Sequence, residues 1–211
     1  MGFIGNIGRI RTLMAKDMNA HIGDIAVLKM DGVSMAARPE HRDAMLALGD
    51  YNPVVDLDAL AAMPENSFGY AVATFMRDND LSPFVFTDEI DADMRRRNAF
   101  GIRLAQTHDL VHVLADFGTD WPGEMGVYAV QYAQRWSVWS PVLALATMVF
   151  YPFFTFFALG DLRRAWRRGV ALGQRAPFLL GERLEDQFDQ PLVEVRRRYN
   201  LVDPTPVPQA A

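Results

Sequence analysis

Apolar residues recur at helical spacing along most of this chain, and the sustained alternation that is typical of strands is almost absent. Residues 56–63 and 68–77 each carry a short helical pattern that ends in proline or in a polar cluster. A longer pattern begins near Asp91 and runs to about Ala115. A further helix is predicted to begin at Pro122, because proline suits a first helical turn. The pattern therefore predicts an all-α fold.

The length of 211 residues predicts one helical domain over residues 1–203. A proline-rich tail over residues 204–211 is expected to be disordered. Residues 1–20 carry an apolar stripe at helical spacing, flanked by three basic residues. That stripe fits a helix lying on a membrane surface and equally a helix packed on its own core.

The segment 136–160 contains no charged residue, and its length approaches that of a bilayer span. Pro141 and Pro152 interrupt it, and in lipid the backbone groups they free would need other partners. Three interpretations stay open: a bent helix in the core, a membrane-dipping or lipid-lined segment, and a transmembrane helix.

Composition narrows the classes of function. The formal net charge of −5 argues against nucleic acid as a partner, since phosphate binding needs a basic face. The absence of cysteine excludes disulfides, thiolate zinc sites and cysteine nucleophiles, and it is compatible with a cytosolic compartment. With only four histidines in the chain, few residues remain from which a metal site could be built.

Residues 108–124 (HDLVHVLADFGTDWPGE) hold the densest group of candidate metal ligands. His108 and His112 are about one helical turn apart, so both project from the same helix face, with Asp109 beside them. Glycine and proline after the helix allow the chain to turn back and present Glu124. Two imidazoles and two carboxylates suit zinc, iron or manganese. The alternative is a pair of core histidines with ordinary hydrogen-bond partners.

The predicted second helix carries a polar stripe in which Tyr128, Gln131 and Arg135 follow Glu124 at spacings of four, three and four residues. We hypothesise that Tyr128 and Gln131 support the metal ligands or bind a substrate head group. An exposed polar helix face would give the same pattern.

The pattern HDxxH, followed by eleven residues ending in glycine and then by glutamate, resembles the signature of the Coq-four family of coenzyme Q biosynthesis proteins. Residues 64–83 and 169–202 also resemble that family, so the likeness covers roughly residues 50–202 and is weakest over residues 1–50. Before the first histidine the family commonly has Arg-x-Arg-Glu, where this chain has RLAQT. The residues that carry the pattern are His108, Asp109, His112, Gly123 and Glu124.

The resemblance implies an all-helical, membrane-associated protein of ubiquinone biosynthesis. It implies metal-dependent oxidative decarboxylation at ring carbon C1 of a polyprenylated 4-hydroxybenzoate precursor. Zinc is the favoured metal, with iron, manganese and cobalt as alternatives. Asp109 and Asp116 are the nearest acids for proton transfer, and Asp109 is the predicted catalytic residue. The implied metal ligands are His108, Asp109, His112 and Glu124.

A polyprenyl tail requires an apolar lipid-binding cleft near the bilayer. The arginines that follow at residues 163–168 could meet lipid head groups or a phosphate. The expected partners are the polyprenylated quinone precursor, membrane lipid, other ubiquinone-biosynthesis proteins and a second copy in a homodimer. The expected location is cytoplasmic, on the inner face of the membrane. The predicted lining residues of the cleft are Phe150, Phe153, Phe154 and Phe157.

Three other functions compete with the decarboxylase. One is a non-catalytic lipid-binding scaffold that organises ubiquinone-biosynthesis enzymes around a structural metal. Another is a metallohydrolase, which Asp109 argues against, because metalloproteases of the HExxH type have a longer glutamate there. The last is a plain helical bundle.

Overall fold

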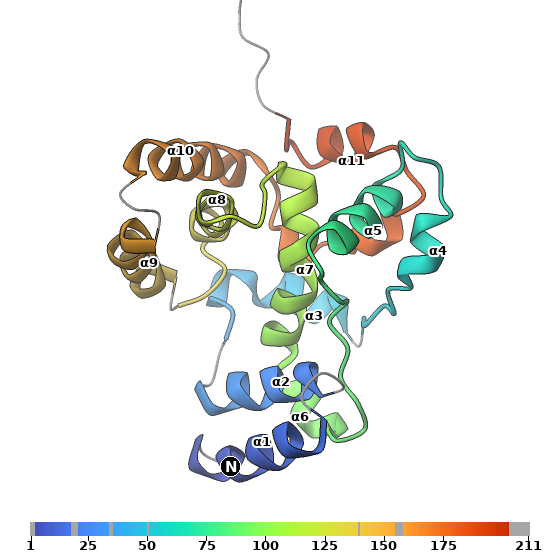
Figure 1. Cartoon of the computed structure of the whole chain (residues 1–211), viewed down its shortest axis with the longest axis vertical. Coiled ribbons are helices and arrows are strands. Elements are labelled where there is room, and N and C mark those ends of the chain that lie inside the picture. The colour runs from blue at the N-terminus through green and yellow to red at the C-terminus, as the bar shows by residue number, and fades with distance from the viewer. Residues whose placement is uncertain are drawn as a thin grey trace, which may run out of the picture.

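The computed structural model describes residues 3–17, 21–33, 36–49, 51–138, 140–154 and 158–202. Within these ranges the regular elements are helices, no strand occurs, and the helices form one domain (Figure 1). The predicted all-α fold is therefore confirmed. The predicted tail, residues 204–211, lies outside the described residues.

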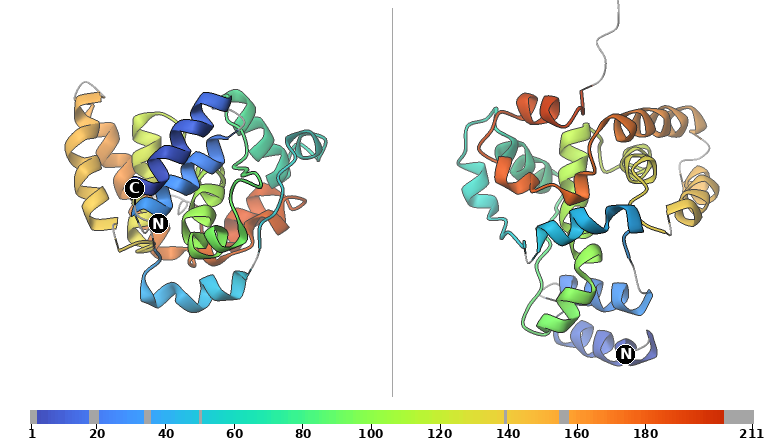
Figure 2. Two further views of the ribbon diagram at one scale, coloured as in Figure 1. Left: turned by 90° about the horizontal axis from the view of Figure 1, so that it is seen from below. Right: turned by 180° about the vertical axis from the view of Figure 1, so that it is seen from behind.

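The helices pack in two groups on either side of α7, with a third group at one end of it (Figures 1 and 2). Short 3₁₀ turns at Pro39–His41 (η1), Leu179–Gly181 (η2) and Leu184–Gln187 (η3) connect some of them. In chain order the helices are α1 (Phe3–Asp17), α2 (Ile22–Val33), α3 (Arg42–Leu48), α4 (Leu57–Ala61), α5 (Phe68–Asp78), α6 (Ala92–Arg97), α7 (Ala99–Ala115), α8 (Trp121–Ala133), α9 (Ser140–Phe154), α10 (Leu159–Arg175) and α11 (Leu192–Arg198).

The predicted long helix from Asp91 to Ala115 is wrong in one respect, because it is divided into α6 and α7 at Asn98. The side-chain amide of Asn98 donates to the carbonyl of Met94 and to the carboxylate of Asp31. A short polar side chain that bonds to nearby backbone in this way competes with a continuous helix. The break changes the direction of the chain before α7 enters the core.

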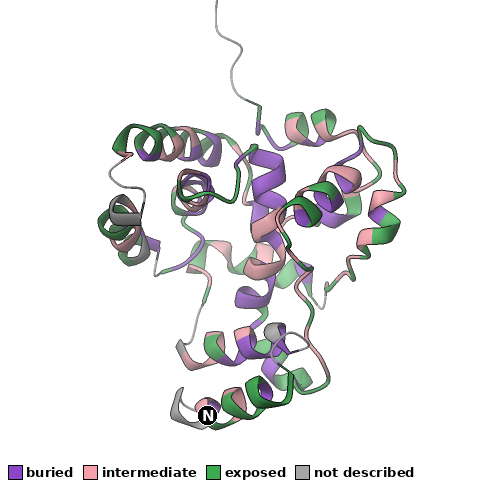
Figure 3. Ribbon diagram, in the orientation of Figure 1, coloured by how far each residue is buried: buried purple, intermediate pink, exposed green. Residues whose placement is uncertain are grey.

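Helix α7 forms the centre of the molecule and is the most continuously buried element (Figure 3). Helices α8, α9 and α10 lie on one side of it, and α4, α5 and α11 lie on the other (Figure 1). Leu110, Val111 and Leu114 of α7 are fully or almost fully buried in the main hydrophobic core. Burial of apolar surface around α7 therefore fixes the face from which the two histidines project.

A salt bridge ties the first half of α7 to the C-terminal region. Arg103 Nη1 lies 2.5 Å from Glu185 Oε1, and only 3% of each side chain is exposed. Arg103 also donates to the carbonyls of Leu180 and Glu182. With these bonds its guanidinium is well satisfied, as a buried charge must be.

Helices α1, α2 and α6 enclose a second, smaller core beside the first turn of α7 (Figure 1). Leu13 of α1 is buried there against α2, whereas Met14 is half exposed. Asp31 binds this group together, because its carboxylate accepts hydrogen bonds from Asn6, Arg97 and Asn98. Helix α1 therefore packs on its own core, as one of the two interpretations of residues 1–20 has it, and contact of this helix with a membrane surface stays a prediction.

Within the apolar segment 136–160, the structure places α9 on the outside of the molecule (Figure 1). Trp136 is buried just before this helix, and Ala144 faces the interior. The interpretation of the segment as a buried core helix is wrong for α9, because one face of it is open to solvent. Among the described residues, no helix has the length and apolar character needed to cross a bilayer. The exposed apolar side chains of α9 are Val142, Leu145, Met148, Val149 and Phe150.

Glycines bring the backbones of α8 and α10 into direct contact. A Cβ atom on Gly169 would lie 2.2 Å from the carbonyl oxygen of Gly126, and one on Gly173 would lie 2.7 Å from that of Val130. Both distances are far below van der Waals contact, so neither position accepts a side chain without movement of the helices. This seam holds α8 at a fixed distance from α10.

We expect Gly169→Ala to lower the free energy of unfolding by about 1–3 kcal/mol, the usual cost of overpacking. Gly160→Ala in the same helix is the matched control, because a Cβ there has no neighbour within 4 Å. The control should be neutral or stabilising by up to about 1 kcal/mol, since alanine favours a helix more than glycine does. Urea unfolding measures both variants, and equal stability would show that the seam is not tight.

Candidate metal centre

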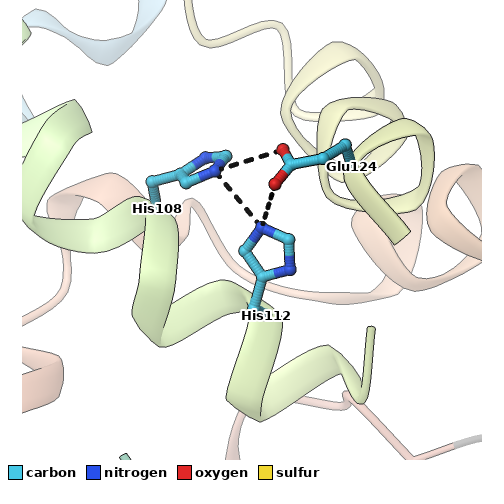
Figure 4. Close-up of side chains that lie close together, drawn as sticks. All are labelled: His108, His112 and Glu124. Atoms are coloured by element: carbon cyan, nitrogen blue, oxygen red, sulfur yellow. Dashed lines mark hydrogen bonds and ion pairs between the residues drawn. The ribbon is translucent and has the colours of Figure 1, made fainter. Parts of the chain in front are cut away.

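His108 and His112 project from the same face of α7 toward the first turn of α8, as their spacing predicts (Figure 4). The two Nε2 atoms lie 3.2 Å apart. Glu124 lies across from them, with Oε2 at 3.4 Å from His108 Nε2 and Oε1 at 3.4 Å from His112 Nε2. Three side chains from two helices thus converge on one point.

The chain reverses within a few residues to bring Glu124 to this position. Asp116 ends α7 in the left-handed conformation, with φ 55° and ψ 55°, and its N–H donates to the carbonyl of His112. Gly123 then packs so closely that a Cβ on it would lie 1.9 Å from the carbonyl oxygen of Gly118. Asp120 caps α8 by accepting a hydrogen bond from the N–H of Gly123 at 2.9 Å. Asp116 and Asp120 therefore have structural roles in the turn.

The same turn orients the ring of His112. His112 Nδ1 lies 3.3 Å from the carbonyl oxygen of Phe117, which can only accept a hydrogen bond. Nδ1 therefore carries a proton. Nε2 faces His108 and Glu124, where it donates to Glu124 when the ring is charged and would offer its lone pair to a metal ion when the ring is neutral. The ring of Phe75 stacks on His112 with centroids 5.5 Å apart and covers its buried side.

Gln131 contacts His108 at Nδ1, the ring nitrogen that does not face Glu124. Its side-chain amide is buried, and 3.2 Å separates Gln131 Nε2 from His108 Nδ1. An amide can present either its nitrogen or its oxygen to a neighbour by a half-turn. With the oxygen presented, Gln131 accepts the Nδ1 proton of His108 and leaves Nε2 free as a ligand. This contact fits the hypothesis that Gln131 supports the metal ligands.

Electrostatics favour an ionised carboxylate between the histidines. Burial alone would raise the pKa of Glu124, but hydrogen bonds from His108 and His112 outweigh it and lower the pKa to about 2. Burial also opposes the charged form of His108, yet the hydrogen bond and charge of Glu124 raise the pKa of that ring overall. Glu124 is therefore a carboxylate at neutral pH, which is the form that binds a cation.

The geometry fits a small divalent metal ion. Nitrogen ligands about 2.0–2.1 Å from a tetrahedral zinc ion lie about 3.3 Å from each other. The two Nε2 atoms, 3.2 Å apart, match that separation. Among the described residues these three side chains form the one group whose ligand atoms could hold an ion, with all of them within 4.8 Å of one another. Two imidazoles and a carboxylate suit zinc, iron or manganese.

Asp109 does not join this group of three. It is partly buried beside the pair, and burial raises the pKa of its carboxyl group while the two histidines oppose that rise. Its assignment as a metal ligand and as the catalytic acid stays a prediction.

Apart from Gln131, the predicted substrate-binding residues are Tyr128 and four phenylalanines, and the structure places only some of them. The hydroxyl of Tyr128 donates to the carbonyl of Ser140 at 3.0 Å, so it joins α8 to the start of α9. The side chain of Phe150 is 59% exposed. Phe153 and Phe154 belong to α9, but their side chains lie outside the described part of the structure, as does the whole of Phe157.

Three neighbours of the site were not identified from the sequence. The carbonyl of Phe117 carries no signal in its side chain, and Phe75 looks like any core residue of α5. Tyr151 of α9 packs edge-on against Trp121, with ring centroids 4.9 Å apart. Burial and the nearby charge of Glu124 raise the pKa of Tyr151. The one signal in the sequence for Tyr151 is that a tyrosine hydroxyl stands in the largely apolar segment 136–160.

The chain is similar to proteins of one family. A family model described as "Coenzyme Q (ubiquinone) biosynthesis protein Coq4" matches residues 34–205. A mitochondrial ubiquinone biosynthesis protein COQ4 homolog of Anopheles gambiae is 29% identical over 149 residues, covering 70% of this chain and 51% of that protein. A homolog of the same name from Danio rerio is 27% identical over 168 residues, covering 71% and 55%. The chain thus spans about half the length of these curated relatives.

A solved structure shares the fold. It is a crystal structure of a protein from Nostoc punctiforme that is provisionally assigned to ubiquinone biosynthesis. The two chains align with a TM-score of 0.61 and 23% sequence identity, over 94% of this chain and 90% of the other. The resemblance drawn from the motif and its flanks is confirmed at the level of the family.

We expect purified wild-type protein to retain a stoichiometric divalent metal and His112→Ala to lose it, because the variant removes one of three converging ligands. Asp109→Asn should retain most of the metal, since Asp109 lies outside the group of three. His41→Asn is the control for loss of a histidine elsewhere. Elemental analysis of folded protein measures each, and equal metal content in wild type and His112→Ala would exclude the site.

We expect Gln131→Leu to weaken zinc binding about 10–100-fold, the usual cost of losing a residue that orients a ligand. Gln131→Glu should bind nearly as well as wild type, because a carboxylate also accepts the Nδ1 proton of His108. Competition with a chromogenic chelator gives the affinities, and Gln174→Leu on the exposed face of α10 is the control. Equal losses in the two Gln131 variants would mean that its role is only structural.

Proposed function

Because the chain belongs to the Coq4 family of coenzyme Q (ubiquinone) biosynthesis proteins, we propose that it acts in ubiquinone biosynthesis as a metal-dependent enzyme. The proposed reaction is oxidative decarboxylation at ring carbon C1 of a polyprenylated 4-hydroxybenzoate precursor. The proposed centre consists of His108, His112 and Glu124, with Asp109 as the nearest further acid.

The observation that supports an enzymatic function is that one side of the three-ligand group is accessible to solvent. The side chain of His112 is 1% exposed, whereas those of His108 and Glu124 are 32% and 31% exposed. One side of the group is therefore closed by protein and the other is accessible. Structural zinc sites are closed by four protein ligands, whereas catalytic sites have three and keep one position for water or substrate. The arrangement here resembles the catalytic kind and favours an enzyme over a scaffold.

In net terms, the C1–carboxylate bond breaks, carbon dioxide leaves, and a hydroxyl derived from water takes its place. Dioxygen is the co-substrate that accepts the two electrons and becomes hydrogen peroxide. When bound, the metal supplies a positive charge that stabilises negative charge on the oxygen substituent of the ring.

The protein's own residues hold and orient this centre. The carbonyl of Phe117 and the amide of Gln131 fix the two imidazoles, and Glu124 supplies the negative charge that balances the cation. Phe75 and the core around His112 exclude water from the closed side. Asp109, with a pKa raised by burial, is the candidate to move a proton at the ring.

An apolar cavity supports the proposal that the substrate carries a prenyl tail. It lies between α8, α9 and α10 and has a volume of ≈ 300 Å³. Met125, which follows Glu124, lines it together with Met148, Leu162 and Trp166. Arg163 and Arg167 are the charged residues of the lining. None of the four predicted phenylalanines is among its described lining residues.

The exposed apolar face of α9 supports contact with a membrane. Its five large apolar side chains are each 45–65% exposed, which is unusual for so many neighbouring residues on one helix. Lipid would cover this face, and the nearby arginines of α10 would meet anionic head groups. The homodimer, the protein partners and the inner-face location stay predictions.

The test is release of carbon dioxide from a polyprenylated 4-hydroxybenzoate in detergent, under air, by protein loaded with zinc, iron, manganese or cobalt. We expect carbon dioxide and the C1-hydroxylated product in equal amounts with at least one metal. His112→Ala should abolish both, and His41→Asn should not. If the protein binds metal and the prenylated compound but forms no product with any of the four, the scaffold is the better description.

A further inference from the structure

A second cavity lies on the opposite side of α7 from the metal centre. It is open to the surface and lined by residues of α3, the segment after α3, α6 and the first half of α7, together with Phe86, and its volume is ≈ 570 Å³. Cavities that bind small molecules measure about 300–1,000 Å³, so it is large enough for a ligand of its own.

The direction of the α7 side chains separates the two sites. Ala99, Ile102, Arg103 and Gln106 line the cavity and recur at the spacing of one helix face. At about 100° per residue, His108 projects on the opposite side from Ala99. A ligand in this cavity therefore lies behind the helix that carries the histidines and does not enter the metal centre.

The charge of the cavity is unlike that of the whole chain. The chain has a formal net charge of −5, yet three arginines and no acid are found among the described residues that line the cavity. Arg103 is matched by the buried carboxylate of Glu185. The excess positive charge comes from Arg95 and Arg96 of α6.

Both of these guanidinium groups are available to a ligand. Arg95 lies over the ring of Phe86 at 5.7 Å, and no described carboxylate is within ion-pair distance of it. Arg96 pairs with Asp93 one turn away, but both side chains are largely exposed, so the pair is weak and easily exchanged. An arginine stacked on an aromatic ring keeps its hydrogen-bond donors free at the edge.

The wall facing these arginines is already ordered. The ring of Tyr51 contacts the guanidinium groups of Arg103 and Arg183, whose central carbons lie 5.5 and 4.9 Å from the ring centroid. Its hydroxyl donates to Asp186 at 2.9 Å. Gln106 donates to Asn52 at 2.5 Å. Preformed walls reduce the entropy that a ligand must overcome on binding.

We propose that this cavity binds an amphipathic anion. Arg95 and Arg96 bind its carboxylate or phosphate, because a guanidinium forms paired hydrogen bonds with either group. Leu46, Leu48 and Ile102, which are among the apolar residues that line the cavity, contact its apolar body.

The test is calorimetric titration of the metal-loaded protein with octyl phosphate, octanoate, inorganic phosphate and the neutral 1-octanol. Octyl phosphate or octanoate should bind, and inorganic phosphate and octanol should each bind at least about tenfold more weakly, because each lacks one half of the recognition. Arg95→Gln with Arg96→Gln should weaken binding of the anionic amphiphile by about tenfold or more. Arg11→Gln with Arg164→Gln removes the same charge elsewhere and should leave it unchanged.

Four outcomes would overturn the proposal. They are no binding of either anionic amphiphile, equal affinity for inorganic phosphate, equal affinity in the Arg95/Arg96 variant, and equal loss in the control variant. The same titration of His112→Ala distinguishes the two sites: retained binding is expected even if the metal centre and its proposed reaction fail. Loss of binding in that variant would mean that the ligand occupies the metal centre.

Discussion

Glu124 reaches the two histidines because the chain reverses within a few residues of the end of α7. The reversal depends on Asp116 in a left-handed conformation and on contact between Gly118 and Gly123 that leaves no room for a side chain. Arg168 donates to the carbonyl of Asp116, and Arg196 to that of Val113, so α10 and α11 both hold this turn. Its backbone also supplies the carbonyl of Phe117 that orients His112. The site and the packing of the last two helices thus share one short segment.

Much of this arrangement could be predicted from the sequence because it follows from helical spacing. The all-α fold, the shared face of His108 and His112, and the return of Glu124 across a Gly/Pro break are all local consequences of pattern. The break at Asn98 was missed because it depends on Asp31, far away in sequence. The surroundings of α9 stayed open between three interpretations for a related reason: an uncharged segment has the same composition whether core, lipid or solvent covers it. A backbone hydrogen-bond acceptor, such as the Phe117 carbonyl that orients His112, has no signature in the side chains.

Helix α7 separates two kinds of chemistry. On one face, two imidazoles and a carboxylate make a centre of low charge that suits a cation. On the other, arginines and apolar side chains surround a cavity that suits an anion. The buried pair of Arg103 and Glu185 lies on the second face and anchors the helix to the C-terminal region. The helix is held rigidly between the two sites, because its apolar residues fill the core on both sides.

The seam between α8 and α10 has a consequence for how this protein can change over evolutionary time. Where two backbones touch at Gly126 and Gly169, no rotamer intervenes, so repacking of other side chains does not shift the helix that carries Glu124. Substitutions can therefore accumulate on the outer surfaces of α9 and α10 without changing the geometry of the three converging side chains. The contact between Gly126 and Gly169 thus separates the outer surfaces of α9 and α10, which tolerate substitution, from the metal centre, which does not.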